Sequence, residues 1–312
     1  MRGIRTEIIN TTEQISVLVD WLVLRHASSD LYLPTMYIDL EGVDLCREGS
    51  ISILTLLIDT GISTIGVYLI DVHLLGARAF NTSGVKRKTM KDILEDEKIP
   101  KVFFDVRNDS DALFAHFSVA LQGVEDVQLM ESATRKTTAS RKFLSGLAKC
   151  VEKSVLLELG GNTRASWKLA KEKGERLFKP ELGGSYEIFN QRPIPEDIIS
   201  YCAGDVQCLP GLREKFGRGA NRWQALVNEE TKKRVVASQK PGYQPHGPNR
   251  AMAPWSDHQN MTLDQWNSVP PRNYFDGDWD GQDWDDDQDW DDGRDDNSYE
   301  DWTRAPWQGP PS

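Results

Sequence analysis

Short apolar segments alternate with helical patterns across the first 240 residues, and this alternation constrains the fold more than any other feature of the chain. Helical spacing of apolar residues begins behind a capping box at residues 11–14 and returns several times after residue 74. Strand-like runs are found at residues 36–40, 51–58, 67–70, 102–104 and 124–127. Strands interleaved with helices predict an α/β fold, in which helices flank a mixed five-stranded sheet.

The pattern stops near residue 240, where the composition changes. Residues 241–312 contain no isoleucine but seven of the ten tryptophans, and Asp-Trp-Asp recurs three times between residues 278 and 291. Residues 246–312 hold 16 acidic residues and 4 arginines, whereas residues 1–245 hold 32 acidic and 33 basic residues. We therefore expect a near-neutral domain over 1–240, able to bind a polyanion, and a disordered acidic tail over 241–312.

Cysteine usage and hydropathy indicate an intracellular protein. The four cysteines show no CxxC spacing and are too few for a disulfide framework. No apolar run is long enough to span a bilayer, and polar residues follow Met1–Arg5 where a secretory signal would be apolar. We expect no membrane partner. The short basic run 86–88 does not decide between nucleus and cytoplasm.

The strongest local feature is the sequence Asp39-Leu40-Glu41 at the end of the first predicted strand. Residues two apart in a strand point to the same face, so the two carboxylates are forced together. A hard cation such as Mg²⁺ or Mn²⁺ would relieve their repulsion. A solvated strand end is the commoner explanation of an isolated DxE sequence.

Two further groups of polar residues lie later in the chain. Tyr201 and Asp205 are four apart in a predicted helix and therefore share a face. An exposed helical pair would look the same. Asp105, Asp109 and Asp111 gather where the fourth strand turns into a helix, a place where helix capping by Asp is common, and we expect capping by Asp109 in any case.

In their order along the chain these motifs resemble those of the ribonuclease D-type 3′-5′ exonuclease domain, the tyrosine branch of the four-acid (DEDD) superfamily. Residues 37–50, YIDLEGVDLCREGS, are similar to the first motif of the Egalitarian-like subgroup. Residues 101–113, KVFFDVRNDSDAL, resemble the second motif, and residues 201–206, YCAGDV, match the third. The segments 124–129 and 192–197 are also similar, and the resemblance runs from about residue 8 to residue 216.

This resemblance implies a ribonuclease H-like fold and a two-metal site. Its metal ligands would be Asp39, Glu41, Asp111 and Asp205, with Tyr201 as a fifth catalytic residue that orients the attacking water. Asp111 is preferred to its acidic neighbours because the family's aspartate precedes x-Leu, as in residues 111–113. Two Mg²⁺ or Mn²⁺ ions about 4 Å apart would clamp the scissile phosphate, activate water and stabilise the leaving 3′-oxygen. The products would be nucleoside 5′-monophosphates.

The expected substrate is the 3′ end of a single-stranded nucleic acid, with RNA favoured over DNA by the resemblance. Leu40 and Arg107 are the candidate substrate contacts. Positive charge for phosphates would come from residues 86–88, 91, 135–136, 141–142 and 168–176, although a solvated face is the commoner explanation for any one of them. The tail would bind a protein partner or, by mimicking a single strand, the domain's own basic groove.

Two alternatives belong to other functional classes. One is a nucleic-acid-binding adaptor that keeps the exonuclease fold without cleaving, as some relatives of this subgroup do after losing their acids. The other is a scaffold that acts through its tail. The presence of all four acids and the tyrosine favours the enzyme.

Overall fold

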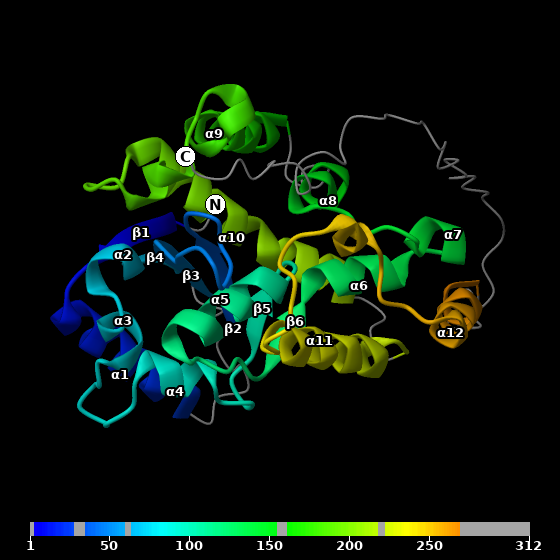
Figure 1. The fold of residues 1–312 in the computed structure, drawn as a ribbon, viewed down its shortest axis with the longest axis horizontal. Coiled ribbons are helices and arrows are strands. Elements are labelled where there is room, and N and C mark those ends of the chain that lie inside the picture. Colours follow the sequence, from blue (N-terminus) through cyan, green and yellow to red (C-terminus); the bar gives the residue numbers. More distant parts are fainter. Residues whose placement is uncertain (1–2, 28–34, 60–63, 155–160, 218–221, 269–312) are drawn as a thin grey trace, which may run out of the picture.

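The structure is a computed structural model that describes residues 3–27, 35–59, 64–154, 161–217 and 222–268. The centre of the molecule is one mixed sheet with the strand order β1-β4-β3-β2-β5-β6 (Figure 1). β2 runs antiparallel to β3 and parallel to β5, and β3 runs antiparallel to β4. The strands are β1 Gly3–Ile9, β2 Thr35–Glu41, β3 Ile53–Asp59, β4 Thr64–Asp71, β5 Lys101–Phe103 and β6 Val124–Asp126.

The sheet has six strands, so the expectation of five was wrong by one. The additional strand is β1, which pairs in parallel with β4 at the edge of the sheet. Its sequence carries charged residues at positions 5 and 7, where an edge strand can expose them to solvent. The mixed α/β architecture itself is confirmed.

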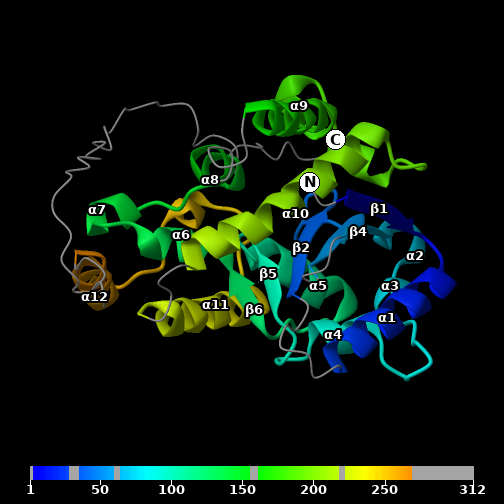
Figure 2. The same cartoon turned by 180° about the vertical axis from the view of Figure 1, so that it is seen from behind.

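Helices cover both faces of the sheet and enclose two separate cores. α10 (Glu196–Gly217, with Pro210 inside it) runs across one face, while α1 (Thr12–Ala27), α4 (Met90–Leu94) and α5 (Arg107–Phe117) pack against the other (Figures 1 and 2). The predicted capping box at the start of α1 is present: the Thr11 hydroxyl accepts from the Gln14 backbone, and the Gln14 side chain accepts from the Thr11 backbone. α2 (Val72–Leu75) and α3 (Arg78–Asn81) follow β4.

A second group of helices lies beside the β6 edge of the sheet (Figure 1). α6 (Val127–Thr134) continues directly from β6, and α11 (Gln224–Ser238) packs against α5, α6 and β6. α9 (Gly161–Phe178) packs on α10. The remaining elements are α7 Thr138–Arg141, α8 Leu147–Ser154, η1 Pro180–Leu182, η2 Tyr186–Asn190, η3 Pro248–Ala251 and α12 Asp257–Ser268.

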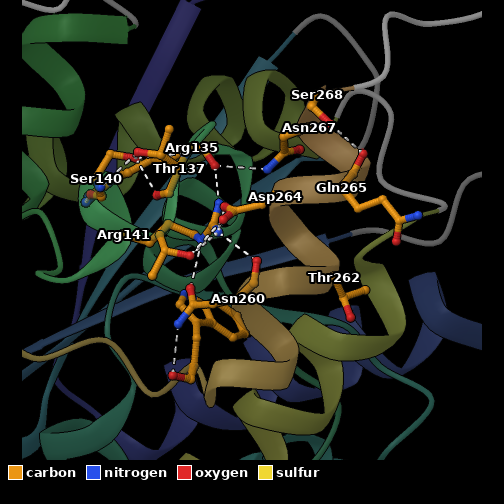
Figure 3. Close-up of polar contacts among 12 residues, drawn as sticks. Arg135, Thr137, Ser140, Arg141, Asn260, Thr262, Asp264, Gln265, Asn267 and Ser268 are labelled. Carbon is orange, nitrogen blue, oxygen red and sulfur yellow. Dashed lines mark hydrogen bonds and ion pairs between the residues drawn. The ribbon is translucent and has the colours of Figure 1, made fainter.

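The expectation that the chain is disordered from residue 241 is wrong for residues 241–268. Trp255 and Leu263 are buried, and the Trp255 indole donates to the Ser132 hydroxyl at 2.9 Å. Arg141, whose side chain is fully buried, bonds Asn260 and forms an ion pair with Asp264 of α12 (Figure 3). These partners, 119 and more residues away from Arg141, could not be read from local composition. Residues 269–312, with the Asp-Trp repeats, lie outside the described residues.

Every helix in the described part of the chain is too short or too polar to cross a membrane.

Candidate active site

Two of the predicted acids, Asp39 and Glu41, lie at the end of β2, where strand alternation places them on the sheet face that α10 covers. The register sets Asp39 opposite Thr55 and Glu41 opposite Ile53 of β3, in the middle of the sheet. Leu40 points to the other face and is buried, 3% exposed, in the core beneath α1 and α5. Its side chain therefore points away from the two acids, and its role as a substrate contact stays a prediction.

α10 brings Tyr201 and Asp205 to the same place. The segment before α10 is fixed to the sheet because Arg192 forms an ion pair with Asp71 at the end of β4. The Ser52 hydroxyl bonds Asn190 in the same segment at 2.6 Å. With α10 held in this way, ligand atoms of Asp39, Glu41 and Asp205 all lie within 4.8 Å of one another.

The electrostatics of this cluster are those of carboxylates held together away from water. Burial, followed by the charge of Asp205, raises the pKa of Asp39 to about 7. Burial and the charges of Asp39 and Asp205 raise the pKa of Glu41 well above its usual value. Tyr201 is 7% exposed, and burial with the charge of Asp205 raises the pKa of its phenol further, so it stays protonated at neutral pH. A bound cation would offset the repulsion among the carboxylates.

Lys171 of α9 occupies the centre of these contacts. Its ammonium donates to both oxygens of Asp205, at 2.7 and 3.0 Å, and to the Tyr201 hydroxyl oxygen at 3.2 Å. It also lies 4.3 Å from the centre of the Tyr201 ring. Burial works against the ammonium, yet the carboxylate of Asp205 raises the pKa of Lys171 above its usual value. Lys171 falls within the range 168–176 that the sequence predicts to supply charge for phosphates, but nothing there distinguishes it from the other lysines of its helix.

α9 approaches α10 closely at Gly174. A Cβ atom at this position would lie 2.6 Å from the Cβ and ring atoms of Tyr201, so any larger residue would push the helices apart. On the other side, the ring of Phe178 meets Tyr201 edge-on, with centroids 5.1 Å apart. These contacts fix the tyrosine ring and place Lys171, one turn earlier, beside Asp205.

Asp111 lies elsewhere, which contradicts its prediction as the second acid. Its carboxylate is 1% exposed and is bound by Arg47, whose Nε donates to one oxygen at 2.7 Å and whose backbone N–H donates to the other at 2.8 Å. Arg47 also donates to backbone carbonyls of residues 238, 240 and 241. Both Asp111 oxygens are thus used in joining the loop after β2 to α5 and the end of α11.

Asp109, rather than Asp111, interacts electrostatically with the acid cluster. It lies in the first turn of α5 and is 7% exposed. Burial, followed by the charge of Asp39, raises the pKa of Asp109 well above its usual value. The charge of Asp109 in turn contributes to the raised pKa of Glu41. The expected capping by Asp109 is wrong, because the cap position is Val106 and Asp109 lies three residues inside the helix.

Arg107 is engaged in a structural network rather than exposed at the cluster. It forms an ion pair with Asp105 and donates to the Arg250 carbonyl at 3.0 Å. Although burial opposes it, the Arg107 guanidinium holds the pKa of Asp105 well below its usual range. Asp126 accepts from the backbone of Asp105 and is bound by Arg234 of α11 at 2.7 Å. Arg107 is thus held by Asp105 and the Arg250 backbone, and its contact with substrate stays a prediction.

The predicted phosphate-binding residues separate into two groups. Arg135 is paired with Glu131 and Arg141 is buried beneath α12. The other group is exposed and includes residues 86–88, 136, 142, 168, 173 and 176. The last three lie on α9, the helix whose Lys171 contacts Asp205.

The arrangement can bind hard divalent cations through oxygen. It presents Asp39, Glu41 and Asp205 as a compact set of carboxylates, of which Asp205 is buried and the other two are partly buried. Such donor sets suit Mg²⁺ and Mn²⁺. The protonated phenol of Tyr201 and the ammonium of Lys171 are hydrogen-bond donors at the rim of the set.

Comparison with solved structures agrees with this architecture. The chain is similar to the RNase D of Trypanosoma brucei in complex with GMP, with a TM-score of 0.62 and 21% identity over 84% of this chain and 72% of that one. It is equally similar to the same enzyme in complex with RNA U12, with a TM-score of 0.62 and 20% identity over 84% and 79% of the two chains. RNase D of Escherichia coli gives a TM-score of 0.50 at 16% identity over 76% and 51%. These similarities establish an RNase D-like fold.

Among curated proteins, the chain is similar to the piRNA biogenesis protein EXD1. The mouse protein is 29% identical over 173 residues, which are 55% of this chain and 27% of the relative; the human protein is 35% identical over 55% and 30%. The chain thus matches less than a third of the length of these relatives. A family model described as 3′-5′ exonuclease matches residues 21–219. On this match, over more than half of its length, the chain belongs to the 3′-5′ exonuclease family.

Proposed function

We propose that the protein is a metal-dependent exonuclease that shortens single-stranded nucleic acid from the 3′ end, with RNA as the favoured substrate and nucleoside 5′-monophosphates as products. The observation that carries this proposal is the convergence of Asp39, Glu41 and Asp205, whose ligand atoms lie within 4.8 Å of one another. Two of these acids come from a strand and the third from a helix more than 160 residues later. A charge cluster of this kind is costly unless it binds a cation.

The residues fit the divalent cations that exonucleases of the four-acid superfamily normally use. Asp39, Glu41 and Asp205 would hold them. Asp109 would be the fourth acid, because its charge interacts with that of Asp39, whereas Asp111 is bound by Arg47. When bound, the cations would polarise the scissile phosphodiester and lower the pKa of the attacking water. The chain supplies a buried, preformed set of oxygens on a central strand and a long helix.

Tyr201 would position the attacking water. Its raised pKa keeps the phenol protonated, which makes it a hydrogen-bond donor and acceptor rather than a free base. Contacts with Phe178 and Gly174 fix its ring. This role matches the orienting role that the family resemblance implies.

The basic side of α9 would receive the phosphate backbone. Lys168, Lys173 and Arg176 are exposed on this helix, which also carries Lys171. RNA is preferred because the related RNase D structure was determined with RNA U12 and the curated relatives are named for piRNA biogenesis. The related GMP complex is consistent with a mononucleotide product.

The test is cleavage of 5′-labelled and 3′-labelled RNA and DNA oligomers by the full chain with Mg²⁺, Mn²⁺ or a chelator. We expect 5′-labelled RNA to shorten in single-nucleotide steps, with mononucleotide as the first labelled product from the 3′ end. Asp39→Ala and Asp205→Ala should abolish this cleavage. Cleavage by either variant at the wild-type rate would exclude this site, and cleavage in chelator would exclude the metal requirement.

A second candidate function is a nucleic-acid-binding adaptor with a silent site. It is favoured by one observation: Lys171 is bonded to both oxygens of Asp205, so that an ammonium already neutralises part of the cluster. In this case the protein would bind RNA in chelator and in Mg²⁺ with equal affinity and cleave it in neither. The labelled-oligomer experiment distinguishes the two functions directly.

A further inference from the structure

A second set of metal-binding side chains lies outside the acid cluster, at Asp44, Cys46 and His246. One ligand atom of each lies within 4.8 Å of the others. Asp44 and Cys46 belong to the loop between β2 and β3, and His246 belongs to the segment between α11 and η3. The fold therefore brings His246 next to two residues that precede it by 200 positions or more.

The side chains would need only a small rearrangement to share a zinc ion. The His246 Nε2 and Asp44 Oδ1 atoms are 3.1 Å apart, as in an ion pair. Two ligands of one zinc ion, each about 2.0–2.2 Å from the metal at tetrahedral angles, are about 3.3–3.6 Å apart, so this pair would separate by a few tenths of an ångström on binding. The Cys46 side chain is buried, whereas those of Asp44 and His246 are each 55% exposed, so an ion can enter from solvent and keep a water ligand.

We propose that Asp44, Cys46 and His246 bind a zinc ion. Thiolate, imidazole and carboxylate together form a zinc donor set, unlike the oxygen-only set of Asp39, Glu41 and Asp205. The two sites would thus hold different metals.

The zinc ion would fasten the C-terminal segment to the loop that follows Asp39 and Glu41. Arg47, next to Cys46, already joins this loop to the backbone at Ser238, Lys240 and Pro241. A metal ion bound by His246 would add a second link between the same two segments, five residues beyond Pro241. The role is structural, and it does not depend on the proposed nuclease activity.

Cobalt spectroscopy of the full chain tests this site separately from the acid cluster, because a cobalt–thiolate bond gives a charge-transfer band that oxygen ligands do not give. We expect the wild-type protein loaded with Co²⁺ to show this band and stoichiometric Zn²⁺ to remove it. Cys46→Ser should abolish the band, while Cys150→Ser, a control at another buried cysteine, should keep it. No band in the wild-type protein, or a band that survives in Cys46→Ser, would overturn the proposal.

If Cys46→Ser does not fold, His246→Gln provides a second test. The His246 side chain is half exposed, so replacing it should not disturb the fold. Zinc affinity, measured by competition with a chromophoric chelator, should fall at least about tenfold in His246→Gln. His258→Gln, an exposed histidine of α12, should leave it unchanged. Equal affinities in the two variants would show that His246 is not a ligand.

Discussion

At the scale of single residues, Asp109 and Asp111 differ in what already binds them. Arg47 binds both oxygens of Asp111, while the charge of Asp109 interacts with that of Asp39. Asp109→Asn should therefore lower the rate of metal-dependent cleavage by at least about 100-fold, because it removes a charged ligand. It should also lower the affinity for Mn²⁺. Asp111→Asn should retain Mn²⁺ affinity but lower the free energy of unfolding by about 3 kcal/mol, because the largely buried Arg47 loses its partner.

Calorimetric Mn²⁺ titration and chemical denaturation of both variants separate these two effects. The opposite result, with metal affinity lost in Asp111→Asn and kept in Asp109→Asn, would return the second acid to position 111.

Lys171 and a divalent cation would compete for Asp205. The ammonium lies 2.7 and 3.0 Å from the two carboxylate oxygens, which a metal ligand needs free. Lys171→Met should therefore raise Mn²⁺ affinity by about tenfold, equivalent to about 1.4 kcal/mol. Lys173→Met, an exposed lysine of the same helix, is the control and should not change it. Unchanged affinity in Lys171→Met, measured by calorimetry, would mean that Lys171 moves away at no cost.

Sequence spacing could place some of these residues and not others. Asp39 and Glu41, two apart in a strand, and Tyr201 and Asp205, four apart in a helix, share a face by local geometry alone. The choice between Asp109 and Asp111 depends on where α5 begins and on Arg47, which lies 64 residues before Asp111. Local spacing carries no signal of that contact, nor of the approach of Lys171 from another helix.

At the scale of elements, the central strands were predictable because their apolar runs are buried on both faces, as β3 is from Ile53 to Ile58. β1 was missed because edge strands carry charged residues and lack a continuous apolar run. α11 and α12 were missed for a related reason: their few buried residues, such as Val227 and Leu263, are spaced among polar ones. Tertiary contacts, rather than periodicity, stabilise these two helices.

The buried Lys101 of β5 makes the stability of this part of the sheet depend on pH. Its side chain is fully buried and donates to the carbonyls of Ile93 and Asp96, at 3.2 and 2.6 Å. Burial lowers its pKa from 10.5 to about 8. Below pH 8 the amine is charged in both the folded and the unfolded protein, and burying this charge destabilises the folded state. Above pH 10.5 the amine is neutral in both states, and this cost is absent.

The contribution of Lys101 to the free energy of unfolding should therefore increase as pH rises from 8 to 10.5, by up to about 3 kcal/mol. Urea denaturation at several pH values, compared with Lys101→Met, measures this contribution as the difference between the two curves. Lys98→Met, an exposed lysine nearby, should give a curve parallel to the wild type. If the curve of Lys101→Met is also parallel to the wild type, the amine has an ordinary pKa.

At the scale of the whole molecule, the C-terminal segment 246–268 belongs to the folded body. A chain ending at Pro245 would lose the buried Trp255 and Leu263 and leave Arg141 without Asp264. We expect its melting temperature to be lower by roughly 10 °C, since each buried large apolar side chain contributes about 2 kcal/mol. Asp264→Ala in the full chain should cause a smaller decrease. Equal melting temperatures of the full and shortened chains would show that α12 contributes no stability.

Because α12 is part of the fold, the effect of the acidic tail on RNA binding has to be measured in a chain that ends at Ser268. Residues 269–312 hold 14 acidic residues and 3 arginines, whereas residues 1–268 hold 34 residues of each sign. Removing the tail thus changes the formal charge from −11 to zero without removing a described element. If the tail competes for the basic side of α9, RNA affinity at low salt should increase by about tenfold, and the gain should shrink as salt screens the charges.

A full-length chain in which the tail aspartates are replaced by asparagine separates charge from length. It should bind RNA as the shortened chain does, because the carboxylates are the groups that imitate phosphates. Tryptophans of the tail remain in this variant, so a residual weakening of RNA binding would measure stacking of indoles on the same surface. Fluorescence anisotropy of labelled RNA in chelator, where cleavage cannot occur, gives the affinities. Identical affinities of all three chains at low salt would rule out competition by the tail and favour its alternative role of binding a protein partner.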